Sequence, residues 1–219
     1  MTINDRNRFA FSYTAHDARD KNFIYKNFNK SVSYRSNFSQ SKFSATSLVG
    51  TKFKFCSFYG ATFENCLIRG TLFRKCNLQK AVFKNCIISA AVFDRTALKN
   101  SKFIGCKVVS AGKFSELTRS ENIVNTQIYS TFPSESVFNP VLIQTVEQLR
   151  EHKQIRKSTV LHRKKGKLDT VSIEVLLGEF SEEFLINNLA VAAEQIKVEF
   201  HTLTYIQSML RKIEANANV

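Results

Sequence analysis

The feature that most constrains this chain is an apolar residue that recurs at every fifth position over about 90 residues. These central residues are Phe23, Phe28, Ser33, Phe38, Phe43, Leu48, Phe53, Phe58, Phe63, Ile68, Phe73, Leu78, Phe83, Ile88, Phe93, Leu98, Phe103 and Val108, with Ser33 the single polar member. A helix, with a period of about 3.6 residues, and a strand, with a period of about 2, both lose this register within a few turns. The chain must therefore repeat a unit of five residues.

A second column, two residues before each central residue from Ser33 to Val108, holds only small side chains. Its members are Ser, Thr or Ala, together with all five cysteines, which are Cys56, Cys66, Cys76, Cys86 and Cys106. A large and a small residue in fixed phase predict two inward positions in every five residues. The spacing lacks the close cysteine pair of a zinc site, and an odd number argues against a disulfide framework. We therefore expect inert, buried thiols.

The position two residues after the central one favours residues that tolerate a positive φ. It holds Gly50, Gly60, Gly70, Gly105, Asn65, Asn85 and Asn100. Type II turns require such residues at their third position, so the chain should turn a corner about every five residues. Four corners close a square coil of about 20 residues, and successive coils should stack at the β-sheet spacing of about 4.8 Å.

This pattern resembles the pentapeptide repeat family, whose consensus is A-(D/N)-L-x-x. The central Leu is mostly Phe here, the small residue is often Ser, Thr or Cys, and the resemblance covers about 90 residues in eighteen repeats. It implies a mainly β fold, a right-handed quadrilateral β-helix (a solenoid), and the residue pattern after the repeats indicates a mostly α-helical C-terminal segment. The best-understood family members bind type II topoisomerases and protect them from quinolones or peptide poisons, using an acidic rod that resembles DNA.

The charge of this chain contradicts such acidic mimicry. The formal net charge is +14, and residues 21–110 hold 16 Lys and Arg against only Glu64 and Asp94, whereas the rest of the chain is balanced. A strong positive excess usually indicates an anionic partner or a field that keeps the protein in solution. Binding of a topoisomerase by another surface stays open.

One side of the predicted rod gathers basic and aromatic residues on its outside. The candidate binding face consists of Arg35, Lys52, Lys54, Phe55, Arg74, Lys75 and Arg95. Cations beside exposed rings grip phosphates or a partner surface, and a solvated basic face is the alternative. Four apolar outward residues, Leu67, Leu72, Ile87 and Val92, form a candidate patch for docking of the C-terminal helices or for dimerisation.

Three regions are predicted. Residues 1–20, with Phe9, Phe11 and Tyr13, should cap the first coil, and the β-helix should occupy 21–138. It is regular to about 110, is interrupted at Lys113 and Phe114, and resumes in phase in an irregular last coil whose central residues are Ile123, Ile128 and Phe138. Pro133 and Asn139–Pro140 mark the boundary with a C-terminal helical module at 139–219.

Within this module we expect a helix at 141–150, a basic turn at 163–167 and a short helix capped by Asp169 or Thr170. Ser181 should begin a longer helix, and apolar residues recur at helical spacing from 185 to 196 and from 203 to 213, with a break near 198–204. Whether 157–176 is hairpin or helix stays open. The stretches FSEEFLINNLAVAAEQ and LTYIQSMLRKI resemble the C-terminal helical module of bacterial DnaD-type replication proteins, or share only the pattern of amphipathic helices.

We find no residue pattern of an enzyme. The four histidines, His16, His152, His162 and His201, belong to no metal-binding spacing, and no P-loop, GxGxxG or GxSxG motif occurs. We expect no catalytic, cofactor or metal site and no small-molecule substrate. Without a secretory signal or a long apolar run, we expect a cytoplasmic protein. Its predicted role is a rigid scaffold for another protein or a second copy, and the alternative is binding of nucleic acid or another anionic surface.

Overall fold

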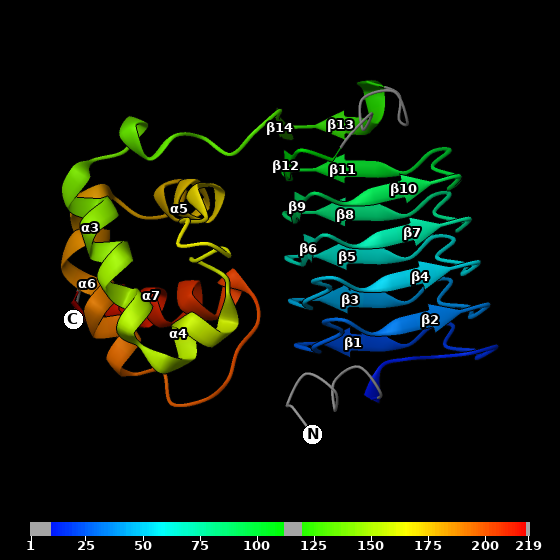
Figure 1. The fold of residues 1–219 in the computed structure, drawn as a ribbon, viewed down its shortest axis with the longest axis horizontal. Coiled ribbons are helices and arrows are strands. Elements are labelled where there is room, and N and C mark those ends of the chain that lie inside the picture. Colours follow the sequence, from blue (N-terminus) through cyan, green and yellow to red (C-terminus); the bar gives the residue numbers. More distant parts are fainter. Residues whose placement is uncertain (1–9, 112–119, 218–219) are drawn as a thin grey trace. The chain divides into compact units, whose positions relative to one another are not determined.

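The computed structural model describes residues 10–111 and 120–217, and the chain divides into two compact units, residues 1–131 and 132–219. The first unit is a β-solenoid of about five turns, and the second consists of helices. In Figure 1 the strands of the solenoid lie one above another in chain order. None of the described helices is long and apolar enough to cross a membrane.

Three sides of the solenoid are parallel sheets of very short strands. The first sheet contains β1 (Asn22–Ile24), β3 (Lys42–Ser44), β5 (Thr62–Glu64), β8 (Val82–Lys84), β11 (Lys102–Ile104) and β13 (Ile123–Val124). The second contains β2 (Val32–Tyr34), β4 (Lys52–Lys54), β7 (Leu72–Arg74) and β10 (Val92–Asp94). The third contains β6 (Leu67–Arg69), β9 (Ile87–Ser89), β12 (Lys107–Val109) and β14 (Gln127–Tyr129).

Partners in these sheets are 20 residues apart in sequence, as Phe43 and Phe63 show. The fourth side has isolated parallel bridges with the same offset, from Asn37 to Ser57 and from Ser57 to Asn77. The repeat therefore produces the predicted four-sided coil of 20 residues.

The core consists of columns of stacked phenylalanine rings. Phe43, Phe63, Phe83 and Phe103 are fully buried, and the centroids of neighbouring rings in this column are 4.6–4.7 Å apart. A second column, Phe53–Phe73–Phe93, has centroid separations of 5.4 and 5.3 Å. A buried Phe removes roughly 150–250 Å² from water, which stabilises the fold by several kcal/mol before entropy is counted.

The small inward column ties neighbouring coils together. Most of its hydroxyl and thiol groups donate to the carbonyl of a central residue of the preceding coil, 23 residues earlier. Thr71 Oγ1 lies 2.6 Å from the Leu48 carbonyl, and Cys86 Sγ lies 3.3 Å from that of Phe63. All five cysteines are buried and free, and burial raises the pKa of the Cys86 thiol. The thiols thus occupy the interior as predicted, where they act as donors like the hydroxyls.

A left-handed residue occurs at every fifth position, which confirms the predicted corners. From residue 15 to 110, each residue whose number ends in 0 or 5 has a φ between 46° and 67°. Gly105 is also required for space, because a Cβ there would lie 2.5 Å from Asn85 Oδ1. Most other corners hold residues with side chains.

The ends of the solenoid extend the repeat. Thr14 and Asp17 bridge to the coil above, and the Phe11 ring stacks on Phe28 with centroids 4.6 Å apart. At the other end a 3₁₀ helix, η1 (Ser120–Asn122), precedes β13 and β14. Phe9, Lys113 and Phe114 lie outside the described residues, and Phe138 ends a short 3₁₀ helix, η2 (Glu135–Val137), without entering a strand.

The second unit contains α3 (Pro140–Gln148), η3 (Leu149–Glu151), α4 (Lys153–Ser158), α5 (Thr170–Leu177), α6 (Glu182–Glu194) and α7 (Leu203–Ala217). Side-chain caps begin four of these helices, with Asn139 on α3, His152 on α4, Asp169 on α5 and Ser181 on α6. Residues 157–176 contain both alternatives, because α4 and α5 flank a turn closed by an antiparallel bridge between His162 and Leu168. Residues 197–202 interrupt the helices near the expected break.

Candidate functional site

The structure brings the predicted basic and aromatic residues to one side of the solenoid. We call this side the basic face: the outward residues of β2, β4, β7 and β10 and the corner that follows each strand. Lys52, Lys54 and Arg74 lie on the strands, whereas Arg35, Phe55, Lys75 and Arg95 are the four corner residues. These residues are neighbours because residues 20 positions apart in the sequence pair in adjacent coils.

The corner column of the basic face is chemically unlike the other three. Arg35, Phe55, Lys75 and Arg95 have φ values of 49°, 57°, 52° and 50°, and none is Gly or Asn. Each of the other corner columns contains at least two Gly or Asn residues. A left-handed conformation costs a bulky L-residue on the order of 1 kcal/mol. Bulky side chains are thus kept at this corner against the backbone preference, a signal that the sequence analysis missed.

Ring contacts fix the cations of this corner. The Tyr34 and Phe55 rings meet edge to face, with centroids 5.4 Å apart at 76°. The Arg35 guanidinium lies 5.2 Å from the centroid of Tyr34, and Lys75 Nζ lies 5.2 Å from that of Phe55. Such contacts contribute about 0.5–1 kcal/mol each at exposed sites. They hold one positive charge beside Tyr34 and another beside Phe55, which is 44% exposed.

A single carboxylate neutralises part of the basic face. Asp94 accepts from Arg74 Nε at 2.6 Å, and its other oxygen is 3.8 Å from Arg95 Nε. Lys52 and Lys54 take part in none of the ion pairs within residues 10–111. The face therefore presents six cations against one acid. The cations on the coils of β2 and β4, which are Arg35, Lys52 and Lys54, remain available to an external anion.

The predicted apolar patch divides between two sides. Leu67 on β6 and Ile87 on β9 are buried, whereas Leu72 on β7 is half-buried and Val92 on β10 is 52% exposed. Leu72 and Val92 are register partners in the sheet of the basic face. This pair adds an apolar strip beside the cations.

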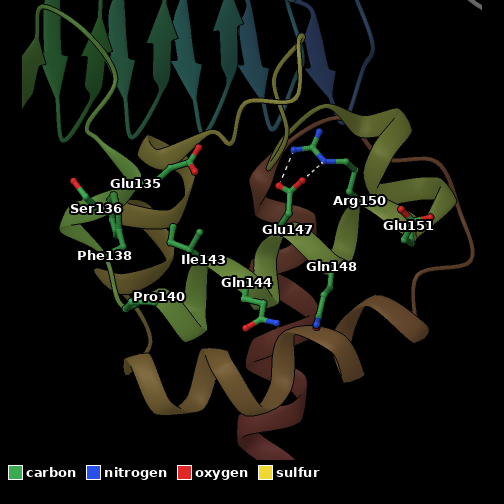
Figure 2. A pocket seen from close by; sticks show the side chains of 10 residues that line it. All are labelled: Glu135, Ser136, Phe138, Pro140, Ile143, Gln144, Glu147, Gln148, Arg150 and Glu151. Atoms are coloured by element: carbon green, nitrogen blue, oxygen red, sulfur yellow. Dashed lines mark hydrogen bonds and ion pairs between the residues drawn. The ribbon is translucent and has the colours of Figure 1, made fainter.

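The helical unit has a cleft that the sequence analysis missed. Figure 2 shows its lining, which encloses an open volume of about 780 Å³ between η2 and α3. Phe138, Pro140 and Ile143 supply an apolar wall, and Glu135 and Glu151 lie at the rim. Its residues come from η2, the loop that follows η2, α3 and η3, and no motif or spacing in the sequence marks them.

The lining of this cleft combines carboxylate, amide and apolar side chains. The lining contains no His, Cys, Lys or Tyr, so it offers no base with a pKa near neutrality. Glu147 is paired with Arg150 at 2.6 Å, and this hydrogen bond lowers the pKa of the Glu147 carboxyl. In the described part of the chain, no group of three or more His, Cys, Asp or Glu residues is placed to hold a metal ion.

The solenoid's square coils, central Phe columns and left-handed corners define a class of repeat protein. Residues 36–112 match the profile of the family described as pentapeptide repeat region. The chain therefore carries a pentapeptide repeat region, which confirms the resemblance seen in its residues.

Solved structures of pentapeptide repeat proteins are similar to about half of this chain. One from the Arabidopsis thaliana thylakoid lumen is 20% identical, with a TM-score of 0.27, over 50% of this chain and 70% of that one. Rfr23 from the cyanobacterium Cyanothece 51142 is 14% identical, with a TM-score of 0.28, over 46% and 93%. QnrB1, a plasmid-mediated fluoroquinolone resistance protein, is 14% identical, with a TM-score of 0.23, over 53% and 89%. No curated protein matched.

Proposed function

We propose that this chain is a non-catalytic scaffold that binds an acidic protein partner on the basic face of its solenoid. The observation that carries the proposal is the corner column, where Arg35, Phe55, Lys75 and Arg95 all adopt a left-handed conformation that Gly or Asn would adopt more readily. Strain of this kind is kept where the side chains serve a purpose other than folding.

The shape of the face fits a large partner. Four coils at a spacing of about 4.8 Å make a wall about 15 Å high. Protein interfaces are enriched in Arg and aromatic residues, and this face combines Arg35, Arg74 and Arg95 with two rings. The apolar strip of Leu72 and Val92 would supply contact area beside the charges.

The family resemblance makes a type II topoisomerase one candidate partner. The charge of the solenoid makes acidic DNA mimicry an unsuitable mechanism, so such a target would have to offer an acidic surface. A supercoiling assay with a topoisomerase poison tests this directly, and failure to protect the enzyme at any dose would remove that target.

Binding of nucleic acid to the same face is the second candidate. It is favoured by the exposed Phe55 ring between Arg35 and Lys75, because bases stack on such rings while cations hold the phosphates. If about six cations contact duplex phosphates, the log–log salt slope of binding should approach roughly −5.

The test compares two fourfold charge reversals. One changes Lys54, Arg74, Lys75 and Arg95 to Glu, and the control changes Lys30, Lys42, Lys99 and Lys102, which lie off the basic face. Both alter the net charge equally. Fluorescence anisotropy would measure binding of a polyglutamate peptide and of a DNA duplex.

We expect the face variant to lose about tenfold or more in affinity for polyglutamate, while the control stays within about threefold of wild type, because contacting charges outweigh distant ones. Equal losses in both variants would refute the basic face as the site. A salt slope near −5 with the duplex, lost only in the face variant, would favour the second candidate.

A further inference from the structure

The basic turn of the helical unit, Arg163–Lys167, has a defined backbone. Lys165 and Gly166 have φ values of 61° and 70°, and the Arg163 amide donates to the Lys167 carbonyl at 2.7 Å. Two successive positive φ values are typical of a tight turn, and this hydrogen bond leaves residues 164–166 as the loop of a hairpin. The antiparallel bridge between His162 and Leu168 closes this hairpin.

Two arginines hold the turn in place. Arg163 donates from Nε to the Leu168 carbonyl at 2.8 Å, and its guanidinium lies 3.6 Å from the centroid of the Phe132 ring. Arg150 donates to the Gly166 carbonyl at 3.1 Å while it is held by Glu147. The backbone is therefore ordered before any ligand arrives, which removes part of the entropy cost of binding.

Three lysines project from this fixed backbone. Lys164, Lys165 and Lys167 are exposed, and none takes part in an ion pair within residues 120–217. Two nearby acids are already engaged. Glu147 pairs with Arg150, and the buried Asp169 caps α5 by accepting from the Ser172 amide at 3.0 Å.

We propose that the basic turn is a second binding site that contacts the phosphates of a nucleic-acid backbone. Lysine is depleted in protein interfaces, and the tip offers no ring or apolar side chain to a protein surface. Lysine ammonium groups are common partners of backbone phosphates, where they position the chain without reading sequence. A narrow hairpin tip with three such groups in four residues fits this task.

This site lies on a different unit from the basic face and goes beyond the scaffold function. It would let one chain hold an acidic partner through its solenoid and nucleic acid through its helical unit. The helical unit is neutral overall, with eleven Lys and Arg against eleven Asp and Glu over 132–219. The cluster of cations at the turn is therefore a local excess of positive charge in a neutral unit.

The experiment uses the full chain and a labelled 20-base-pair duplex. One variant changes Lys164, Lys165 and Lys167 to Ala, and a matched control changes the exposed Lys153, Lys197 and Lys212 to Ala. Anisotropy titrations between about 50 and 200 mM salt give the affinity and its salt slope. Circular dichroism confirms the folding of each variant.

We expect the turn variant to bind the duplex at least tenfold more weakly at about 100 mM salt. Its slope should become shallower by roughly 2 to 3, since each phosphate contact contributes about 0.9. The control should keep the wild-type slope. Changing the three lysines to Arg should retain most of the binding, because the charges remain.

Three outcomes would overturn the proposal. They are absence of duplex binding by wild type at about 50 mM salt, equal behaviour of the turn variant and its control, and an equal loss toward polyglutamate, which would indicate an acidic protein partner. The fourfold reversal of the basic face separates this proposal from the scaffold function. If that reversal abolishes duplex binding and the turn variant does not, nucleic acid binds the solenoid.

Discussion

The solenoid and the helical unit handle charge in different ways. Residues 21–110 carry a net charge of +14 and have few acids with which to pair, whereas residues 132–219 are neutral. The helical unit pairs Arg150 with Glu147, Lys157 with Glu199, and Arg211 with Glu179. The solenoid thus gathers six of its 16 cations on the basic face, and the helical unit places three lysines outside its ion pairs at one turn.

The two units also differ in how their cores are specified. Each coil of the solenoid repeats the contacts of the one before it, so a stacked ring such as Phe63 is supported by identical neighbours above and below. The helical unit has no such translation and depends on individual caps, such as Ser181 on α6, and on particular apolar contacts. Damage should therefore spread along the first unit and stay local in the second.

The largest effect should come from removing one ring of the stacked column. Phe63→Ala should destabilise the solenoid by about 3–5 kcal/mol, because Phe63 is fully buried and a cavity would remain between Phe43 and Phe83. Urea unfolding measures the loss, and hydrogen exchange should show weakened protection in β3, β5 and β8 together. A loss below about 1 kcal/mol, or one confined to β5, would contradict the stacked-coil description.

A smaller effect should follow from removing a donor of the inward column. Thr71→Val keeps the shape of the side chain but removes the hydroxyl that donates to the Leu48 carbonyl at 2.6 Å. We expect a loss of about 1–2 kcal/mol in the free energy of unfolding. Val82→Thr on the outward side of β8 serves as the control and should change stability by less than about 0.5 kcal/mol. Equal effects would mean that the inward hydroxyls contribute only volume.

Acidification should lower the stability of the helical unit and leave that of the solenoid unchanged. Burial lowers the pKa of His162, whose Nε2 lies 2.9 Å from the Val146 carbonyl, and also that of His201. The folded unit then binds fewer protons than the unfolded chain, so its stability is full above about pH 6.5 and declines as the pH falls below that value.

Hydrogen exchange at about pH 7.5 and 5.5, corrected for intrinsic rates, should show weakened protection in α3 and α5 while β5 and β8 keep theirs. His162→Gln should reduce this pH dependence. A solenoid that loosens in parallel, or a variant with the wild-type pH dependence, would count against His162 as a cause.

The smallest effect should be a gain in stability at the basic corner. Lys75→Gly relieves the left-handed backbone and should stabilise the solenoid by about 0.5 kcal/mol, while it weakens binding of polyglutamate. Gly70→Ala, at a corner where a Cβ would meet nothing within 4 Å, should do the reverse and destabilise by about 1 kcal/mol. If Lys75→Gly destabilised the fold, the corner residues would be structural rather than kept for binding.

The sequence predicts the solenoid far better than it predicts the helical unit or the sites. A period of five residues places Phe63 inward and Lys75 outward without any further knowledge, because each coil repeats the last. The register likewise brings Arg35, Phe55 and Arg95 to one corner. The left-handed strain at that corner also follows from the sequence, because this corner column lacks the Gly and Asn residues that the other three columns contain.

In the helical unit, local signals identified the caps at Asp169 and Ser181 but not the tertiary contacts. The cleft between η2 and α3 depends on how Phe138 and Ile143 are oriented, which no periodicity encodes. Arg150 and Gly166 are 16 residues apart, and their hydrogen bond follows from the packing of the folded unit rather than from a local pattern. The sequence shows the basic residues of the turn, but it does not show the contacts that hold the backbone of the turn in place.

The 20-residue offset between paired strands has a consequence for how such a chain can change over evolutionary time. A deletion of residues 52–71 would join Thr51 to Leu72, and every remaining inward side chain would keep a neighbour of the same kind. A deletion of one residue would instead rotate all later positions out of phase. Insertions and deletions that preserve the fold should therefore add or remove whole coils. The length of the solenoid would then change in fixed steps of about 4.8 Å.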